Sequence, residues 1–280
     1  TVKTRKEFEQ FLKSDSIEQI RAIEKKLLDG TNAEAFAVDG FCVPCDKKVS
    51  FLVDIQSGGQ RHKNGWTPNW RERLECPLCR MNNRQRLVAT LVQQVLSDKE
   101  GQHVYFMEQV TPIYNWATTT FKEDHLVGSE YLGHEYEGGA EIKGIRHEDV
   151  ENLSFSDEAL DLIVSNDVFE HVPSPAKAFA ECARVLKPDG VMLATIPFHN
   201  DCDLSVTRAE LINGELTYIL PAAYHGNPVS EDGSLVFADF GWDLLEVVRA
   251  AGFTDISVDV YASAIFGHLG GGQLVFRLAK

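Results

Sequence analysis

The central part of the chain alternates between two kinds of apolar pattern. Residues 161–165 and 191–196 are short apolar runs rich in β-branched side chains, whereas residues 175–186 place their apolar side chains at helical spacing. Residues 187–190 (KPDG) contain the proline and glycine that end a helix and form a turn. The pattern predicts a strand, a helix and a second strand, which is the βαβ unit of a parallel sheet.

The same alternation continues on both sides of this unit. An amphipathic helix with a glycine stop is predicted at residues 240–253, and a polar insertion interrupts the pattern at about residues 199–237. Within the insertion, Asn213-Gly214 between two alternating runs indicates a β-hairpin. Seven strands are expected in total, at residues 103–107, 125–130, 144–147, 161–165, 191–196, 256–260 and 273–278.

The first part of the chain is organised differently. Its expected elements are two helices within residues 3–29, strands at 35–38 and 48–53, and a helix from Asn82 or Asn83 to about Leu96. The regular alternation of strands and helices begins only after this helix. We therefore expect a small helical and metal-binding module at residues 1–100 and an α/β domain at residues 101–280.

The composition is that of a globular protein with an acidic balance. The 280 residues are 44% hydrophobic and 25% charged, with a formal net charge of −15, which argues against broad binding to nucleic acid or to an anionic membrane. No apolar stretch approaches the roughly 18 residues that span a bilayer, and the first segment (TVKTRKEFEQ) lacks an apolar signal-peptide core. We expect a cytoplasmic protein with no membrane partner, and the sequence predicts no oligomeric state.

Residues 46–99 reverse this charge balance locally, with ten Lys or Arg against five acids. A solvated face is one interpretation of such a surplus, and a site for an anionic substrate or partner is the other. The second interpretation keeps RNA open as a partner.

Four of the six cysteines form two C-x-x-C pairs, Cys42 with Cys45 and Cys76 with Cys79. A pair at this spacing places two thiolates on one side of a tight turn, and four thiolates are the ligands of a structural, tetrahedral zinc ion. If the pairs were redox dithiols, each of the two pairs would need an explanation of its own. An iron–sulfur cluster fits the thirty-residue separation of the pairs poorly. The sequence therefore predicts a zinc ribbon, with the other two cysteines unliganded.

Polar side chains follow the predicted strands at their carboxyl ends, which is the edge where open α/β sheets bind ligands. Asn166 and Asp167 come directly after the strand at residues 161–165. Glu130 ends the second strand, twenty-two residues after Glu108 at the end of the first. This is close to the spacing at which a carboxylate holds the hydroxyls of a nucleotide ribose.

Two motifs beside this edge carry a family resemblance. Glu170-His171-Val172 and the run RVLKPDG that ends at Gly190 resemble the central motifs of class I S-adenosylmethionine (SAM)-dependent methyltransferases. The resemblance covers the α/β domain. It implies a Rossmann-like, mostly parallel sheet of seven strands with helices on both faces, the last strand lying antiparallel between the fifth and the sixth, and SAM as the cofactor.

The chain departs from the family pattern in two places. Asp189 replaces the usual first glycine of RVLKPGG, although Asp tolerates left-handed backbone angles better than most residues. Where the family usually has a glycine-rich loop, the chain has residues 109–113 (QVTPI), in which Thr111 can cap the next helix. We interpret this loop as a variant that still receives the small methionine carboxylate.

The resemblance also implies which residues hold the cofactor. Residues 147–155 resemble the family segment in which an acid and the following residue reach the adenine, and Asp149 and Val150 match those positions. The expected cofactor-binding residues are Glu108, Gln109, Glu130, Tyr131, Asp149, Val150, Asn166, Asp167 and Val168.

The insertion lies where class I enzymes build their acceptor pockets. Methyl transfer is an in-line displacement, so the enzyme must align the nucleophile and, if the nucleophile is a hydroxyl, remove its proton. The candidate bases are His171, His199 and His225, with Tyr224 as an orienting group. Each of these is also open to a structural or binding role.

Three functions fit the sequence. The polar insertion and acidic charge favour methyl transfer to a small-molecule or glycan-type hydroxyl acceptor. RNA methylation is the first alternative, because some rRNA methyltransferases carry an amino-terminal zinc module with four ligands. A non-catalytic scaffold that has lost SAM binding is the second, and the missing glycines favour it.

Overall fold

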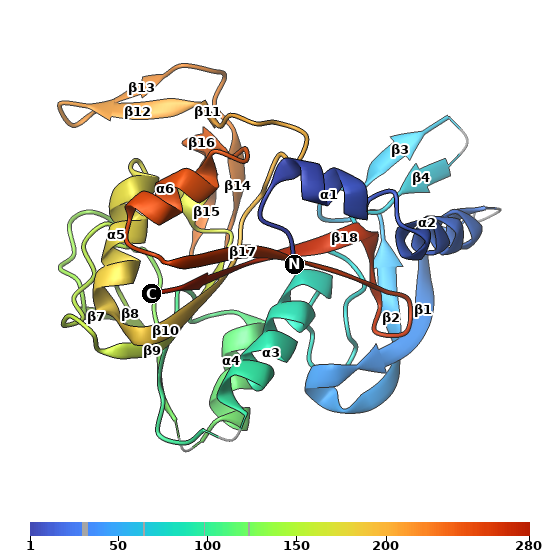
Figure 1. The fold of residues 1–280 in the computed structure, drawn as a ribbon, viewed down its shortest axis with the longest axis horizontal. Helices are drawn as coiled ribbons and strands as arrows, with labels where there is room; N and C mark the ends of the chain where they lie inside the picture. Colours follow the sequence, from blue (N-terminus) through green and yellow to red (C-terminus); the bar gives the residue numbers. More distant parts are fainter. Residues whose placement is uncertain (30–32, 64, 98, 123) are drawn as a thin grey trace. The chain divides into compact units, whose positions relative to one another are not determined.

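A computed structural model describes residues 1–29, 33–63, 65–97, 99–122 and 124–280 (Figure 1). The chain divides into two compact units, Thr1–Ser97 with Val258–Val275, and Asp98–Ser257 with Phe276–Lys280. The first break lies close to the boundary expected near residue 100. The hairpin at residues 258–275, expected in the second domain, belongs to the first unit because its two strands are long and make their contacts there.

The first unit contains the helices and short sheets expected at its start. Its elements are α1 (Arg5–Phe11), α2 (Asp15–Leu28), β1 (Ala35–Cys42), η1 (Val43–Cys45), β2 (Lys47–Asp54), β3 (Gln60–His62), β4 (Gly65–Thr67) and α3 (Asn83–Leu96). β1 and β2 pair antiparallel and flank the first cysteine pair. The Asn82 side chain accepts a hydrogen bond from the Gln85 N–H, and Gln85 returns one to the Asn82 backbone. This capping box confirms the expected start of the helix.

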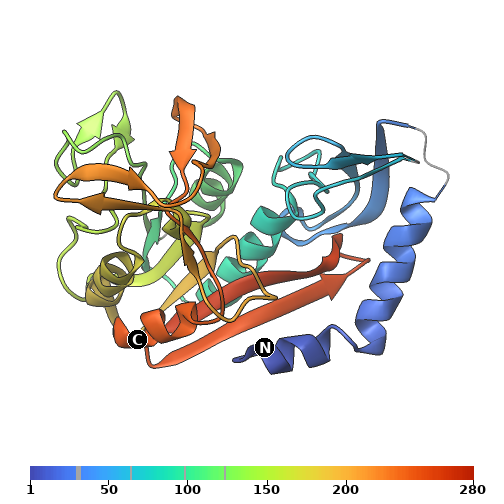
Figure 2. The same cartoon turned by 90° about the horizontal axis from the view of Figure 1, so that it is seen from above.

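The hairpin formed by β17 (Asp255–Ser263) and β18 (His268–Ala279) lies beside α1 and contacts α2 near its turn, within the first unit (Figure 2). Three consecutive glycines, Gly270–Gly272, have positive φ, which other residues rarely adopt. The N–H groups of the first two donate to one carboxylate oxygen of Glu24 on α2, at 2.6 and 3.2 Å. The glycines therefore allow β18 to present its backbone donors to this acid.

Arg86 on α3 fixes the turn of the same hairpin. The side chain is 1% exposed and lies over the ring of Phe51, 3.8 Å from its centroid. Its guanidinium donates to the carbonyls of Phe266 and Gly267 at 2.7 and 2.9 Å. Burial lowers the pKa of Arg86 to about 10, which still leaves it charged at neutral pH.

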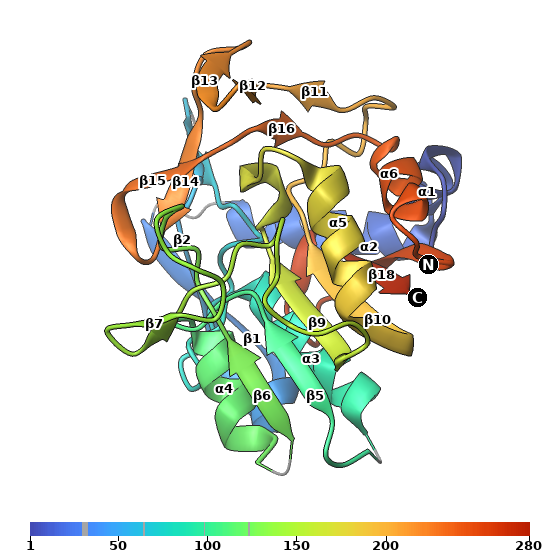
Figure 3. The same cartoon turned by 90° about the vertical axis from the view of Figure 1, so that its left-hand side faces the viewer.

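The second unit is built on the parallel part of a six-stranded sheet with the order β17-β18-β10-β9-β5-β6. Its strands are β5 (His103–Phe106), β6 (His125–Gly128), β9 (Leu160–Asn166) and β10 (Leu186–Thr195), which are parallel and side by side (Figure 3). The end of β18 pairs antiparallel with β10, between β10 and β17. This confirms the expected position of the last strand, and the α/β fold is confirmed with it.

The sheet has six strands among the described residues, not the seven that were expected. Residues 144–147 form no full third strand. Lys143 and Gly144 adopt positive φ values of 53° and 83°, which turn the chain back on itself as the two-residue strands β7 (Glu141–Ile142) and β8 (Ile145–Arg146). A single parallel bridge between Glu130 and His147 is what remains of the expected pairing.

Helices and small hairpins complete the second unit. The helices are α4 (Pro112–Thr120), η2 (Phe169–His171), α5 (Pro175–Val185) and α6 (Leu244–Ala250). The insertion forms β11 (Val206–Thr207), β12 (Ala209–Ile212), β13 (Glu215–Tyr218), β14 (Tyr224–Asn227), β15 (Ser230–Leu235) and β16 (Ala238–Asp239). The hairpin expected at Asn213-Gly214 is confirmed between β12 and β13. No helix of the described residues is long and apolar enough to cross a membrane.

A buried histidine gives the first unit a pH-dependent stability. His268 Nδ1 donates to Asn83 Oδ1 at 2.7 Å, because the Asn83 amide already donates to the carbonyls of Trp70 and Leu269. Burial, aided by the Arg86 charge, lowers the pKa of His268 from 6.5 to about 3. Between these pH values the unfolded chain binds a proton that the folded chain does not, so stability is lost as the pH falls.

We predict that the free energy of unfolding loses up to about 1.4 kcal/mol per pH unit through this one group. His268→Gln keeps a donor for Asn83 but does not titrate. Urea unfolding at about pH 6 and about pH 4.5 should therefore show a smaller loss of unfolding free energy in the variant. The reason is that the variant takes up about one proton fewer when it unfolds. Equal losses in the two proteins would contradict the assignment.

Candidate functional site

Acidic side chains gather at the carboxyl ends of the parallel strands in the second unit. Glu108 follows β5, Glu130 follows β6, and Asp167 follows β9. Glu108 and Glu130 are 7% and 9% exposed. Because parallel strands end at one edge of a sheet, the fold brings these separated acids into one region.

Glu108 is held by the end of β9. The Asn166 amide donates to Glu108 Oε1 in a short hydrogen bond, and Thr195 Oγ1 donates to Asn166 Oδ1 at 3.2 Å. Thr195 Oγ1 also lies 3.0 Å from Asp167 Oδ1. Asp167 has a φ of 55°, and Val168 follows it at the start of η2. Three of the expected cofactor residues are thus connected through one hydrogen-bonded cluster.

Glu130 braces the loop that replaces the glycine-rich segment. Its Oε1 accepts from the backbone N–H groups of Gln109 and Val110, at 2.7 and 3.1 Å. Burial raises the pKa of Glu130, and these two hydrogen bonds oppose the rise. The loop therefore directs its backbone donors at a carboxylate of its own chain.

Gln109 is occupied by its neighbours. Its side-chain amide donates to the carbonyl of Gly144 at 3.0 Å and accepts from the N–H of Arg146 at 2.9 Å. The structure therefore places this side chain as a link between the loop and the β7–β8 hairpin.

The residues expected near the adenine lie beyond the end of β6. The ring of Tyr131 is exposed and packs beside His147, with centroids 5.4 Å apart. Burial, and the nearby carboxylate of Asp149, raise the pKa of Tyr131. Val150 is 8% exposed, and Asp149 Oδ1 accepts from the N–H of Glu151. The ring of Tyr131 and the carboxylate of Asp149 are thus near one another, and Val150 follows Asp149 in the chain.

Two of the four catalytic candidates meet at one acid. His171 Nε2 lies 3.4 Å from Glu170 Oε1, and His225 Nδ1 lies 3.5 Å from the same oxygen. The two imidazole rings are perpendicular, with centroids 4.9 Å apart. Sequence reasoning treated Glu170 only as part of a family motif. Its place between two histidines depends on the β14–β15 hairpin, which no local pattern predicts.

The other two candidates lie outside this cluster. His199 is half-exposed, with its Nε2 3.9 Å from Asp239 Oδ1. Tyr224 is exposed on β14, and its hydroxyl lies 3.5 Å from that of Tyr218. The structure therefore brings only His171 and His225 together.

The four paired cysteines of the first unit converge. The Sγ atoms of Cys42 and Cys79 are 3.8 Å apart, as are those of Cys45 and Cys76, and all four lie within 4.8 Å of one another. A tetrahedron with zinc–sulfur bonds of about 2.3 Å has edges of about 3.8 Å. The geometry fits a tetrahedral ion. The contact with Cys42 lowers the pKa of Cys79 to about 5, which favours a thiolate in this cluster.

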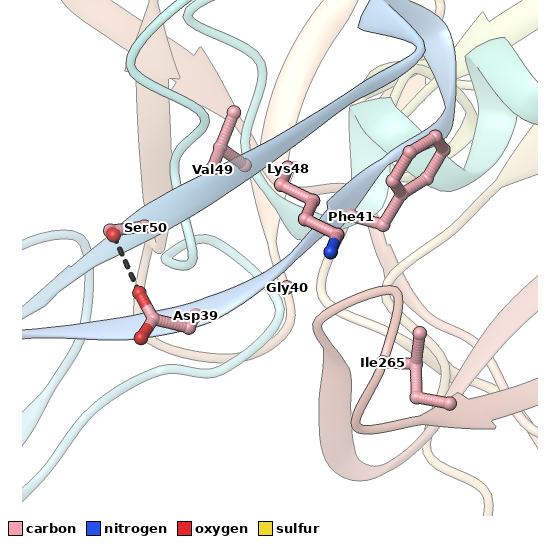
Figure 4. A pocket seen from close by; sticks show the side chains of 7 residues that line it. All are labelled: Asp39, Gly40, Phe41, Lys48, Val49, Ser50 and Ile265. Carbon is pink, nitrogen blue, oxygen red and sulfur yellow. Dashed lines mark hydrogen bonds between the residues drawn. The ribbon is translucent and has the colours of Figure 1, made fainter.

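The first unit also carries a surface hollow of about 530 Å³. It is lined by Asp39, Gly40, Phe41, Lys48, Val49, Ser50 and Ile265 (Figure 4). Asp39 accepts from the Ser50 hydroxyl at 2.6 Å. None of the residues expected to act in catalysis or to bind the cofactor lines this hollow, so we assign it no role in the site.

Comparison with known proteins agrees with the strand-end chemistry. Residues 93–194 match the family model described as a methyltransferase domain. A curated protein of Mycolicibacterium smegmatis, named a probable S-adenosylmethionine-dependent methyltransferase, is 40% identical over 128 residues. That alignment covers 35% of this chain and 50% of the relative, so the chain spans about half of that protein's length. The matched segment of the chain is therefore similar to methyltransferase domains.

Solved structures of low identity were also found. A SAM-dependent methyltransferase from Mesorhizobium loti is 12% identical, with a TM-score of 0.44 over 68% of this chain and 96% of that one. The 1,6-didemethyltoxoflavin-N1-methyltransferase of Burkholderia thailandensis is 17% identical, with a TM-score of 0.39 over 70% of this chain and 77% of that one.

Proposed function

We propose that the chain is a SAM-dependent methyltransferase that acts on a hydroxyl group of a small-molecule or glycan-type acceptor. The observation that carries the proposal is the set of buried acids at the carboxyl edge of the parallel strands, within the segment that matches the methyltransferase domain model. SAM supplies a methyl group activated by its sulfonium. The residues of the chain bind it, align the acceptor and accept the acceptor's proton.

The residues at this edge fit the cofactor by their chemistry. A carboxylate such as Glu130 accepts hydrogen bonds from both hydroxyls of a ribose. Asp149, Val150 and Tyr131 supply an acid, an apolar wall and a ring for the adenine. Glu108 supplies a carboxylate of the sign that attracts the methionine ammonium.

The missing glycines do not remove a place for the methionine carboxylate. Thr111 precedes α4, and its Oγ1 is buried with no hydrogen-bond partner among the described residues. The first N–H groups of a helix lack partners within the helix and favour an anion. An orphan hydroxyl at the start of α4 therefore supports retention of SAM binding over the scaffold alternative.

The acceptor proposal is supported by the insertion. Its strands carry the exposed Tyr218 and Tyr224, and His225 lies beside His171 at the end of β9. Aromatic faces with polar tips suit a sugar or a small polar ring. Either imidazole is of a type that takes up a hydroxyl proton near neutral pH.

RNA is a poorer acceptor for this chain, because the basic surplus of residues 46–99 is largely paired. Arg73 contacts Asp54 at 2.6 Å, Arg84 contacts Glu72 at 3.0 Å, and Arg86 is buried. Arg61, Arg71 and Arg80 also each contact an acid. Arg73, Arg84 and Arg86 are thus held within the first unit, and the exposed Arg61 and Arg80 are each paired with an acid, which leaves few guanidinium groups for phosphates.

We also propose that the four-cysteine cluster holds a structural zinc ion. All four ligand positions of a tetrahedral ion are taken by protein, so no position is left for a substrate. Cys42 and Cys76 are both buried in the core of this unit, next to Phe51 and Trp70. The ion would thus join the two segments that carry the cysteine pairs, within a small core that has little apolar area of its own.

The SAM site is tested by calorimetric titration of the full chain. Wild type should bind SAM, and Glu130→Gln should bind it at least roughly tenfold more weakly, because an amide accepts ribose hydrogen bonds without the charge. Gln can still accept from the loop N–H groups, so the fold should be retained. Glu141→Gln, which changes an exposed acid of the same unit, is the matched control.

Two results would count against these assignments. A wild-type chain that does not bind SAM would overturn the proposed function. Equal affinity in Glu130→Gln and wild type would leave the function in place and remove Glu130 from the cofactor site.

The zinc proposal predicts four sulfur neighbours. X-ray absorption at the zinc edge of the purified chain should show zinc–sulfur distances of about 2.3 Å. Cys79→Ser should lose this signal and unfold at a lower temperature, whereas Cys202→Ser, which changes an exposed cysteine outside the cluster, should keep both. Zinc with no sulfur neighbours in the wild type would contradict the ribbon.

A further inference from the structure

The carboxylate of Glu170 is buried and makes no hydrogen bond among the described residues. Glu170 lies in η2, directly after β9, and is 1% exposed. Among the described residues, neither of its carboxylate oxygens has a hydrogen-bond partner. Burying a carboxylate in this way is unfavourable by several kcal/mol unless a positive charge compensates it. The imidazoles of His171 and His225, which can carry a positive charge, lie 3.4 and 3.5 Å from Glu170 Oε1.

The orientation of His171 indicates where a cation would lie. Its Nδ1 lies 2.8 Å from the carbonyl oxygen of Leu235. A carbonyl only accepts, so Nδ1 carries the hydrogen, and in the neutral ring Nε2 is then a lone pair. That lone pair faces Glu170 Oε1 at 3.4 Å. Two acceptors that face each other repel unless a metal cation or a proton lies between them.

The separations match those of ligands on one metal ion. His171 Nε2 and His225 Nδ1 lie 3.4 and 3.5 Å from the same carboxylate oxygen, and the three ligand atoms lie within 4.8 Å of one another. Two ligands bound tetrahedrally at about 2.1 Å are about 3.4 Å apart. A direct ionic hydrogen bond would be shorter, at about 2.7–2.9 Å.

The chain holds these three side chains in place through its backbone. The carbonyl of Glu170 accepts from the N–H of Phe237 at 2.7 Å, which joins η2 to the segment that follows β15. The register of β14 and β15 shifts between His225 and Asn227, so the strand is irregular next to this histidine. Such irregularities redirect side chains next to functional sites.

We propose that Glu170, His171 and His225 bind a divalent transition-metal cation. Two imidazoles and one carboxylate are ligands that suit zinc, cobalt, iron or manganese. The hydrogen bond from His171 Nδ1 to a backbone carbonyl is the outer contact that metal-bound histidines usually make. Three protein ligands leave at least one position for a substrate oxygen, unlike the four-cysteine cluster.

This cation deepens the proposed methyl transfer and rests on it. In the metal-bound site His171 and His225 hold the cation, so neither imidazole is the base. A hydroxyl acceptor bound at the open position would instead lose its proton to solvent more readily. The acceptor oxygen then attacks the methyl carbon: the oxygen–carbon bond forms, the sulfur–carbon bond breaks, and the electron pair of the broken bond stays on sulfur. The acceptor class is therefore a molecule whose reacting hydroxyl coordinates a metal.

The test is a cobalt titration of the full chain. The protein is used as purified, with any metal that it retains still bound. Cobalt bound by nitrogen and oxygen absorbs through d–d bands, without the thiolate charge-transfer bands of a cysteine site. The wild type should bind one cobalt ion more than Glu170→Gln, with d–d bands only. His225→Ala should weaken this binding by roughly tenfold or more.

The variants are chosen so that the result does not depend on one of them folding. Glu170→Gln keeps the shape of the side chain, and His225 is exposed enough for its removal to leave the core intact. His134→Ala removes an almost fully exposed histidine of the same unit and should bind cobalt as the wild type does. Thermal unfolding without metal checks each fold.

Equal cobalt stoichiometry and equal spectra in wild type, Glu170→Gln and His225→Ala would overturn the proposal and indicate a protonated imidazole instead. Loss of the same signal in His134→Ala would also overturn it, because the ion would then bind surface histidines. SAM titration is a separate measurement, so a chain that binds cobalt at this site but not SAM would contradict the proposed function and leave the metal site standing.

Discussion

The main constraint on the second unit is the burial of carboxylates at one edge of a parallel sheet. Each buried acid must recover the hydration that it loses. Glu108 bonds to Asn166, and Glu130 accepts two backbone N–H groups. Glu148 is bound by Arg146 and Ser154. Of these four side chains, that of Glu170 alone makes no hydrogen bond within the part of the chain that the structure describes, and two imidazoles face it. The edge is thus poised for positive or hydrogen-donating ligands.

The insertion and the loop after β5 adapt this edge to a particular chemistry. The loop gives its N–H donors to Glu130 and its glutamine side chain to the β7–β8 hairpin, so it is ordered without glycines. The β14–β15 hairpin is joined to η2 through Leu235 and Phe237 and carries His225 to Glu170. We infer that the common part of the domain binds the cofactor, whereas the insertion selects and activates the acceptor.

Local patterns predicted most of the fold, whereas the arrangement of the candidate site depends on contacts between distant segments. The β9–α5–β10 unit, the caps and the cysteine pairs depend on residues close in sequence, and Asp189 does adopt a positive φ of 64°. The prediction of a third strand was wrong because Lys143 and Gly144 turn the chain. The alternation of apolar residues does not show this backbone preference. Glu170 was missed because its role depends on His225, which lies on a hairpin far along the chain. The motif itself also does not indicate that the Glu170 side chain is buried.

The most direct test of this account is a crystal structure of the chain grown with S-adenosylhomocysteine and a divalent metal, with anomalous scattering recorded at the metal edge. The account predicts the ribose beside Glu130 and an anomalous peak bonded to Glu170, His171 and His225, with an open position facing the cofactor. A nucleoside bound away from Glu130, together with no anomalous peak at these three residues, would contradict it.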